Sequence, residues 1–195
     1  MNTMKTIAIV LIVILFGSSA AQAKSDISIV NKSSYKINEA KLLNISKSYK
    51  KVVLKYWRVE EVPITIYFVD DFENNEMITP KHLAYHWYVE DPYIYISMNR
   101  VKKDRSILTV VLTHELAETL VNPYLQKYTT YKNRRVPIEI ADPTNSTFYI
   151  NKTMVSDFAL PSFYNIKAKG PYSYTRSLLK PFEPNSIHSW QGIEE

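Results

Sequence analysis

Apolar residues recur with a helical spacing after Asn38, at intervals of three or four positions. The recurring positions are Leu42, Ile45, Tyr49, Val52, Val53 and Tyr56. This period places them on one face of a helix. Asn38 suits the N-cap because its side chain can accept a hydrogen bond from the first turn, and Pro63 limits the helix at its far end. The pattern therefore predicts an amphipathic helix between Asn38 and Pro63.

Three short runs after this helix have the composition of β-strands. Ile64–Val69 is β-branched and aromatic and ends at two aspartates. Residues 82–89 and 93–98 lie on either side of Asp91-Pro92, a turn signal. Runs of this length and composition are typical of strands. We therefore expect one strand followed by a pair arranged like a hairpin.

A second helical pattern follows, and it ends at the helix breaker Pro123. Its apolar positions are Ile107, Leu108, Val111, Leu112, Leu116 and Leu120. Asp104 or Ser106 is the expected N-cap. Residues 148–150 resemble a further strand, and the tail from Pro161 onward is expected to wrap the domain. This order of elements predicts an α+β fold in which a small antiparallel or mixed sheet packs against the second helix.

The first 23 residues have the pattern of a signal peptide. Lys5 supplies a positive charge, residues 6–16 form a short apolar run, and Ala21-Gln22-Ala23 is a small-residue cleavage site. A retained membrane anchor is the alternative, but the run is shorter than the roughly 20 residues that span a bilayer. We expect the mature chain, 24–195, to be a single soluble domain that is secreted or periplasmic and has no membrane span.

The composition excludes several classes of chemistry. The sequence contains no cysteine, which rules out disulfides and thiol catalysis. Only Gly170 and Gly192 follow the predicted signal peptide, so a glycine-rich phosphate loop is absent. The net charge is +5, and the basic residues are scattered without any nucleic-acid-binding motif. We therefore expect no nucleic-acid partner, while weak attraction to an anionic envelope polymer is compatible with the charge.

The second helix contains His114-Glu115-Leu116-Ala117-Glu118, an H-E-x-x-E sequence. Residues four apart share a helical face, so His114 and Glu118 can bind one ion while Glu115 stands beside it. The H-E-x-x-H motif of zinc enzymes works in this way, and zinc also accepts carboxylate oxygen. An exposed His/Glu pair is the alternative, but the apolar surroundings favour a metal site.

A third ligand must come from another segment, and the sequence offers Glu139 and Asp142. Glu139 lies between two isoleucines, an awkward place for an unpaired carboxylate, and we assign it to the metal. Asp142 is then expected to orient His114 by accepting its other ring N–H. Its alternative role is to start a turn with Pro143, and which of the two acids binds the ion stays open.

Three motifs occur in the second half of the chain: residues 109–123 around H-E-x-x-E, residues 139–143 with E-x-x-D-P, and residues 155–163 with V-S-D-F-x-x-P-x-F. Together they resemble a sparsely characterised zincin-like family of bacterial and phage proteins. The resemblance covers about residues 106–183. It implies a metallopeptidase-like fold in which His114, Glu118 and Glu139 hold the metal and Glu115 is the base. Asn122 departs from this pattern, which has an aspartate there.

These residues predict a metal-dependent hydrolase that cleaves a peptide or amide bond. Zinc is the expected ion, and manganese is the alternative because two carboxylate ligands suit a harder metal. Tyr149 and His188 are candidate donors to the oxyanion, although core packing is the simpler role for one of 15 tyrosines. Two rival hypotheses are a non-catalytic secreted or envelope protein braced by this metal or carboxylate network, and a module that binds an anionic polymer.

Overall fold

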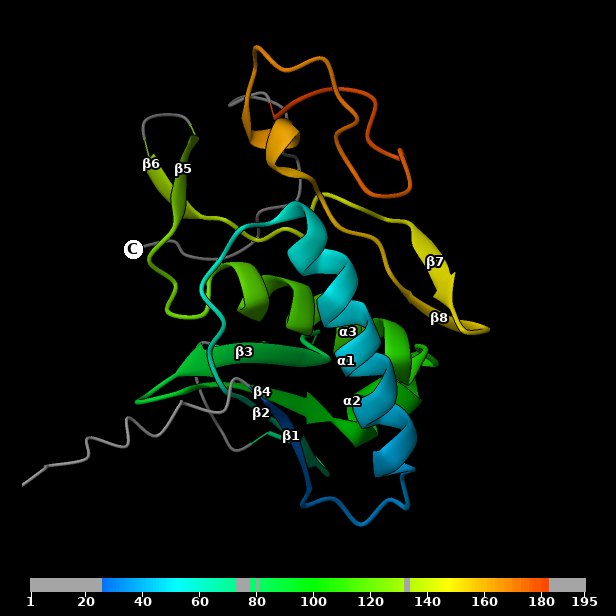
Figure 1. Ribbon diagram of the computed structural model, residues 1–195. Helices are drawn as coiled ribbons and strands as arrows, with labels where there is room; N and C mark the ends of the chain where they lie inside the picture. Colours follow the sequence, from blue (N-terminus) through cyan, green and yellow to red (C-terminus); the bar gives the residue numbers. More distant parts are fainter. Residues whose placement is uncertain (1–25, 73–77, 80, 132–133, 183–195) are drawn as a thin grey trace, which may run out of the picture.

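The computed structural model describes residues 26–72, 78–79, 81–131 and 134–182. The predicted signal peptide lies outside these residues. Helices and strands mix along the chain as an α+β fold, which confirms the α+β class predicted from the sequence, while the zincin-like arrangement stays a prediction (Figure 1). In chain order the elements are β1 (Ile27–Asn31), α1 (Glu39–Tyr56), β2 (Ile64–Val69), β3 (Ala84–Tyr88), β4 (Pro92–Ser97), α2 (Met98–Asp104), α3 (Leu108–Val121), β5 (Tyr128–Tyr131), β6 (Arg134–Pro137), β7 (Thr147–Ile150), β8 (Thr153–Ser156) and a 3-10 turn, Pro161–Tyr164.

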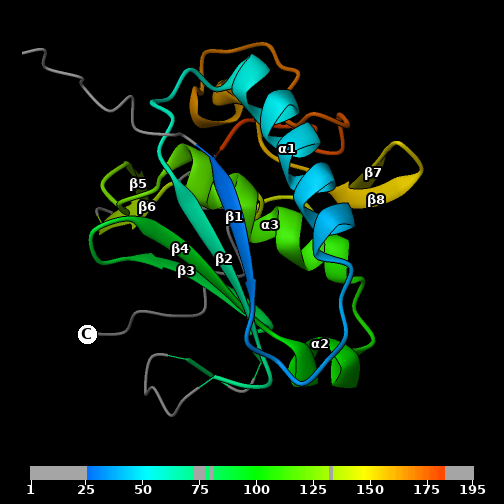
Figure 2. The same cartoon turned by 60° about the horizontal axis from the view of Figure 1, so that its bottom comes forward.

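The main sheet has four strands in the order β1-β2-β4-β3. The first three are parallel, and β3 runs antiparallel to β4 at the edge. Alternate residues of β2 point into the core, where Ile64, Ile66 and Phe68 are buried. Helices α1 and α3 lie on this face of the sheet (Figures 1 and 2). The sheet is therefore mixed, and it packs against the helix that carries H-E-x-x-E.

Among the local differences from the sequence expectations, two concern the sheet edge and the start of α3. Strand β1, which the pattern did not indicate, pairs with β2 at the sheet edge opposite β3. The predicted caps of α3 were wrong, since Ile107 occupies the N-cap position without a side-chain hydrogen bond. Asp104 ends the short helix α2, and the Ser106 hydroxyl donates to the Asp104 carboxylate. Both polar residues thus serve the turn between α2 and α3.

Helix α3 lies in the middle of the fold, in contact with α1, β3, β4 and β8. Its apolar residues Leu112, Leu116 and Val121 are fully buried. The Thr109 hydroxyl donates to the carbonyl of Met154 at 2.7 Å, which ties the helix to β8. Any polar side chain in the central turn of α3 is therefore held in a largely apolar setting. In the described part of the chain, no helix combines the length and apolar character needed to cross a membrane.

The tail after β8 folds back over the domain, as the sequence predicts, and Asp157 fixes it there. The Asp157 carboxylate is completely buried. It accepts hydrogen bonds from the Thr175 backbone N–H at 3.0 Å, the Thr175 hydroxyl at 2.5 Å and the Ser177 hydroxyl at 2.8 Å. The aspartate of the V-S-D-F motif is thus a structural anchor.

Replacing Asp157 with alanine should destabilise the protein without changing its metal content. Three donors lose their acceptor, and each unsatisfied buried group costs about 1–3 kcal/mol. We expect a loss of roughly 3 kcal/mol in the free energy of unfolding, measured by urea denaturation. Unchanged stability would show that the tail is not held by this carboxylate.

Candidate metal centre

The polar turn of α3 forms one wall of a cluster of ionisable side chains. His114 and Glu118 are four residues apart, and His114 Nε2 lies 3.4 Å from Glu118 Oε1. Glu118 is only 4% exposed, whereas the His114 side chain is 31% exposed. The two residues therefore share a face as the sequence predicts, with the carboxylate at the bottom and the imidazole nearer solvent.

A second wall comes from the segment between β6 and β7, which is pinned beside α3. Ile140 and Ala141 are fully buried, and the Ile140 carbonyl accepts from the Ala159 backbone N–H at 2.6 Å. Asn122, at the end of α3, donates its side-chain amide to the carbonyls of Lys127 at 3.0 Å and Ile138 at 3.5 Å. An aspartate could not make these donations. Asn122, which stands where the family pattern has an aspartate, thus ties the helix end to this segment.

Asp142 leaves this segment toward His114. Asp142 Oδ1 lies 3.2 Å from His114 Nε2, the ring nitrogen that also faces Glu118. The backbone N–H of Thr144 donates to the Ala141 carbonyl at 3.0 Å, so a turn is present at Asp142-Pro143 as well. The carboxylate therefore stands where a third ligand would stand, beside the same nitrogen as Glu118, and not where it would orient the ring from its other side.

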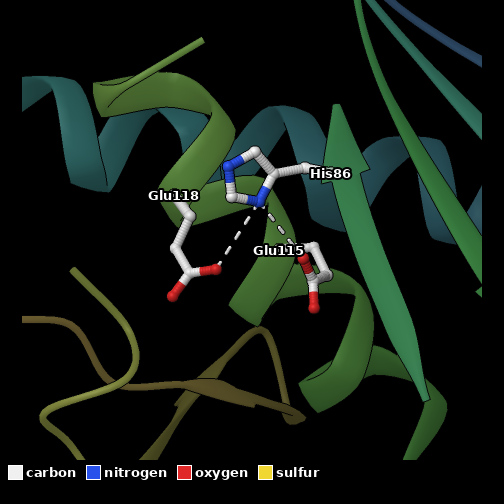
Figure 3. A group of neighbouring side chains, drawn as sticks. All are labelled: His86, Glu115 and Glu118. Atoms are coloured by element: carbon white, nitrogen blue, oxygen red, sulfur yellow. Dashed lines mark hydrogen bonds and ion pairs between the residues drawn. The ribbon is translucent and has the colours of Figure 1, made fainter. Parts of the chain in front are cut away.

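His86, on the edge strand β3, joins the cluster from the sheet and points toward Glu115 and Glu118 of α3 (Figure 3). Its Nδ1 lies 3.3 Å from Glu115 Oε2 and 3.7 Å from Glu118 Oε2. Its Nε2 lies 3.7 Å from Glu139 Oε2. The imidazole is thus surrounded by three carboxylates, and its side chain is only 7% exposed.

Several buried polar atoms of the cluster have no hydrogen-bond partner. These atoms are His86 Nε2, Glu118 Oε1 and Glu139 Oε2. Leaving such atoms unsatisfied is costly, and burying charged groups is costlier still. Two sets of three side chains place their ligand atoms within 4.8 Å of one another, namely His86, Glu115 and Glu118, and His114, Glu118 and Asp142. The donor set of imidazole and carboxylate suits a divalent ion.

Burial and mutual repulsion raise the carboxyl pKa values. Burial raises the pKa of Glu118 well above its ordinary value, and the negative charges of Asp142 and Glu139 raise it further. Burial raises the pKa of Glu139 to about 7, although His86 acts against this. These shifts oppose the ionised form of the acids, so a cation bound among them would relieve a real electrostatic cost.

Both histidines of the cluster also have raised pKa values. Burial lowers the pKa of His86, but its hydrogen bond to Glu115 and the charge of Glu139 outweigh that effect. In the same way, burial lowers the pKa of His114, while the hydrogen bond to Asp142 and the charge of Glu115 raise it. In the metal-free protein, the cluster thus retains protons that its members would release in the unfolded chain.

The metal-free protein should lose stability as the pH rises from 5 to 8. Each of these four groups has a folded pKa above its unfolded pKa, so the native state binds more protons and the unfolding free energy falls with rising pH. Added zinc should reverse the slope, because ligands must be deprotonated. Thermal melts of chelator-treated protein across this range test the prediction, and a melting temperature that rises with pH without metal would contradict it.

The structure brings together five of the seven site residues that the sequence predicted, namely His114, Glu115, Glu118, Glu139 and Asp142. Tyr149 lies on β7 with 65% of its surface exposed, and its role as an oxyanion donor stays a prediction. His188 lies outside the described residues. The role of His188 as an oxyanion donor therefore also stays a prediction.

Sequence reasoning missed two residues of the cluster, His86 and Tyr164. His86 had a signal, since it is one of only four histidines and shares its strand face with the buried Ala84. The Tyr164 hydroxyl donates to the Glu139 carbonyl at 2.9 Å, and burial followed by the charge of Glu118 raises its pKa well above the ordinary value. Tyr164 therefore stays a neutral donor that holds Glu139 in place.

Comparisons with known proteins add no assignment to this site. No protein-family model matches the chain, and searches of curated proteins and of solved structures found no match. The side chains of the cluster themselves therefore indicate its chemistry.

Proposed function

We propose that the protein is a metal-dependent hydrolase that cleaves peptide or amide bonds outside the cytoplasm, with zinc as the ion. The observation that carries this proposal is the buried Glu118 carboxylate, whose Oε1 has no hydrogen-bond partner and lies among the possible ligand atoms of His114 and Asp142. The proposal agrees with the zincin-like family that the sequence motifs resemble. It includes export, which follows from the signal-peptide pattern of residues 1–23.

The arrangement fits an ion better than a network of salt bridges. The cluster contains four carboxylates and two histidines. Among the ion pairs of the described residues, none joins a lysine or an arginine to these six side chains. A network built only for bracing gains little unless opposite charges are paired in good geometry. Here Glu118 faces two further acids and is almost fully buried. A divalent cation would supply the positive charge that these carboxylates lack.

His114, Glu118 and Asp142 are the residues that would hold the catalytic ion. The Asp142 side chain is 47% exposed and that of His114 is 31% exposed, so this end of the cluster opens to solvent. Catalytic metal sites need such an opening, because substrate and water must reach the ion. Glu139, predicted as the third ligand, faces His86 instead, and its place in the first coordination shell stays a prediction.

Glu115 is the residue that would move the proton. A bound divalent ion supplies Lewis acidity to a substrate carbonyl and lowers the pKa of water. Glu115 precedes Leu116 on α3 and lies outside the His114–Glu118 pair, with its side chain only 13% exposed. Its hydrogen bond with His86 fixes its carboxylate. The carboxylate accepts a proton from the attacking water and can return it to the leaving amine.

Hydrolysis of a broad library of peptides and amides, with and without a chelator, tests this function. We expect cleavage by the zinc-loaded mature protein, loss of cleavage after chelation, and recovery when zinc returns. Zinc-loaded protein that cleaves nothing across such a library would favour the bracing role for the cluster.

A further inference from the structure

The two sets of candidate ligands meet at one residue, Glu118, and use its two oxygens separately. Oε1 is the oxygen that faces His114, at 3.4 Å. Oε2 is the oxygen that faces His86, at 3.7 Å. A carboxylate whose oxygens face different histidines has the arrangement of a bridge between two ions. One ion bound about 2 Å from its ligands could not serve both histidines unless their nitrogens approached within about 4 Å.

Charge compensation also favours two ions. With neutral histidines, the ionised carboxylates of Glu115, Glu118, Glu139 and Asp142 carry four negative charges in one largely buried cluster. One divalent ion would leave two of them uncompensated, whereas two divalent ions would offset all four. Four carboxylates and two histidines are also the ligand set of known two-metal carboxylate sites in helical bundles, which shows that this inventory can hold two ions.

The His86 side of the cluster also contains buried polar atoms without a hydrogen-bond partner. Only 7% of the His86 side chain is exposed, and its Nε2 has no hydrogen-bond partner. Glu139 Oε2, 3.7 Å away, is likewise unpartnered. Neither atom belongs to the set around His114. An ion bound to His86 Nδ1 would fix the ring proton on Nε2, so that Nε2 would become the donor that faces the Glu139 carboxylate.

We propose that the cluster holds a second divalent ion between His86, Glu115 and Glu118, with Glu118 bridging it to the ion at His114. This proposal rests on the proposed function, because it adds an ion to the same site. The two ions lie close together and repel each other, so the sites fill in sequence. Glu115 uses the oxygen that faces His86 to bind the second ion. A cation on this carboxylate would lower its basicity, so filling the second site should inhibit hydrolysis.

Calorimetric titration of Zn²⁺ into chelator-treated mature protein tests the proposal. We expect two equivalents to bind in two steps, with hydrolysis rising over the first step and falling over the second. Mn²⁺ loaded at two equivalents should give an electron paramagnetic resonance spectrum of a spin-coupled pair, because ions in two-metal sites lie about 3.5–4 Å apart. Saturation at one equivalent would overturn the proposal.

Variants of the two histidines assign the sites. His86→Gln and His114→Gln should each bind one equivalent fewer than the wild type, and Glu118→Gln should weaken both sites. His82→Gln is the matched control, because His82 is exposed and accepts from the Thr79 backbone N–H outside the cluster. A His86→Gln protein that still binds two equivalents would contradict the assignment, and circular dichroism checks that each variant folds.

The outcomes also separate this proposal from the proposed function. A protein that binds one equivalent and cleaves peptides in a zinc-dependent way keeps the function and loses the second site. A protein that binds two coupled ions and cleaves nothing at any zinc level keeps the site and loses the function.

Discussion

Replacing Glu118 with glutamine is expected to remove tight metal binding and, in the metal-free protein at pH 8, to raise the melting temperature. Glutamine keeps the shape of the side chain but loses the charge that zinc requires. Loss of a side chain that only hydrogen-bonds to a metal ligand commonly lowers metal affinity 10–100-fold. Loss of Glu118, which would itself be a ligand, should therefore lower the affinity at least about 100-fold. Removing a buried negative charge that faces Asp142 and Glu139 should stabilise the metal-free fold.

Metal affinity falls while the melting temperature of the metal-free protein rises, and this combination distinguishes a metal site from a salt-bridge brace. If the cluster were only a salt-bridge brace, Glu118→Gln would remove a partner of two histidines and lower the melting temperature. A gain of several °C is expected instead, since about 1 kcal/mol shifts the melting temperature by 2–4 °C in a domain of this size. Glu39→Gln, on the exposed first turn of α1, is the control and should change neither quantity.

Replacing Glu115 with glutamine is expected to reduce kcat/KM by about 100-fold or more while the ion at His114 stays bound. Loss of a general base commonly costs 10²–10⁴-fold in rate. The side chain keeps nearly its shape, and Glu115 does not belong to the group of His114, Glu118 and Asp142. Under the two-ion proposal, the variant also loses its second equivalent of zinc and the inhibition that goes with it.

Steady-state kinetics at one equivalent of zinc, with metal content measured on the same samples, check this result. Glu115→Gln that loses its first ion as readily as Glu118→Gln does would show that Glu115 is a ligand of that ion. Full activity in the variant would require another base, and Glu139 is then the next acid to test, because it faces the same imidazole.

Elements with strong periodicity could be predicted from the sequence. The spacing of apolar residues identified α1 and α3, and β-branched composition identified β2. The H-E-x-x-E spacing identified the face of α3, since residues four apart meet on any helix. These features depend on neighbours in the sequence, which is why local reasoning found them.

The remaining parts of the site depend on contacts between distant segments. His86 is 28 positions before His114, and only the pairing of β3 at the sheet edge beside α3 brings its imidazole to Glu115. Tyr164 reaches the Glu139 carbonyl from the tail, and one tyrosine among 15 carries no signal of that contact. Whether Glu139 or Asp142 lies nearer to His114 depends on how the chain turns at the buried residues Ile140 and Ala141. In the fold, Asp142 is the acid that contacts His114.

Anomalous X-ray diffraction from zinc-loaded crystals, recorded at the zinc absorption edge, would locate the ion itself. We expect an anomalous peak within coordinating distance, about 2 Å, of His114 Nε2 and a Glu118 oxygen. A second, weaker peak beside His86 Nδ1 is expected when zinc is in excess. Zinc found only at surface residues, with none beside Glu118 and His114, would show that the cluster is not a metal site.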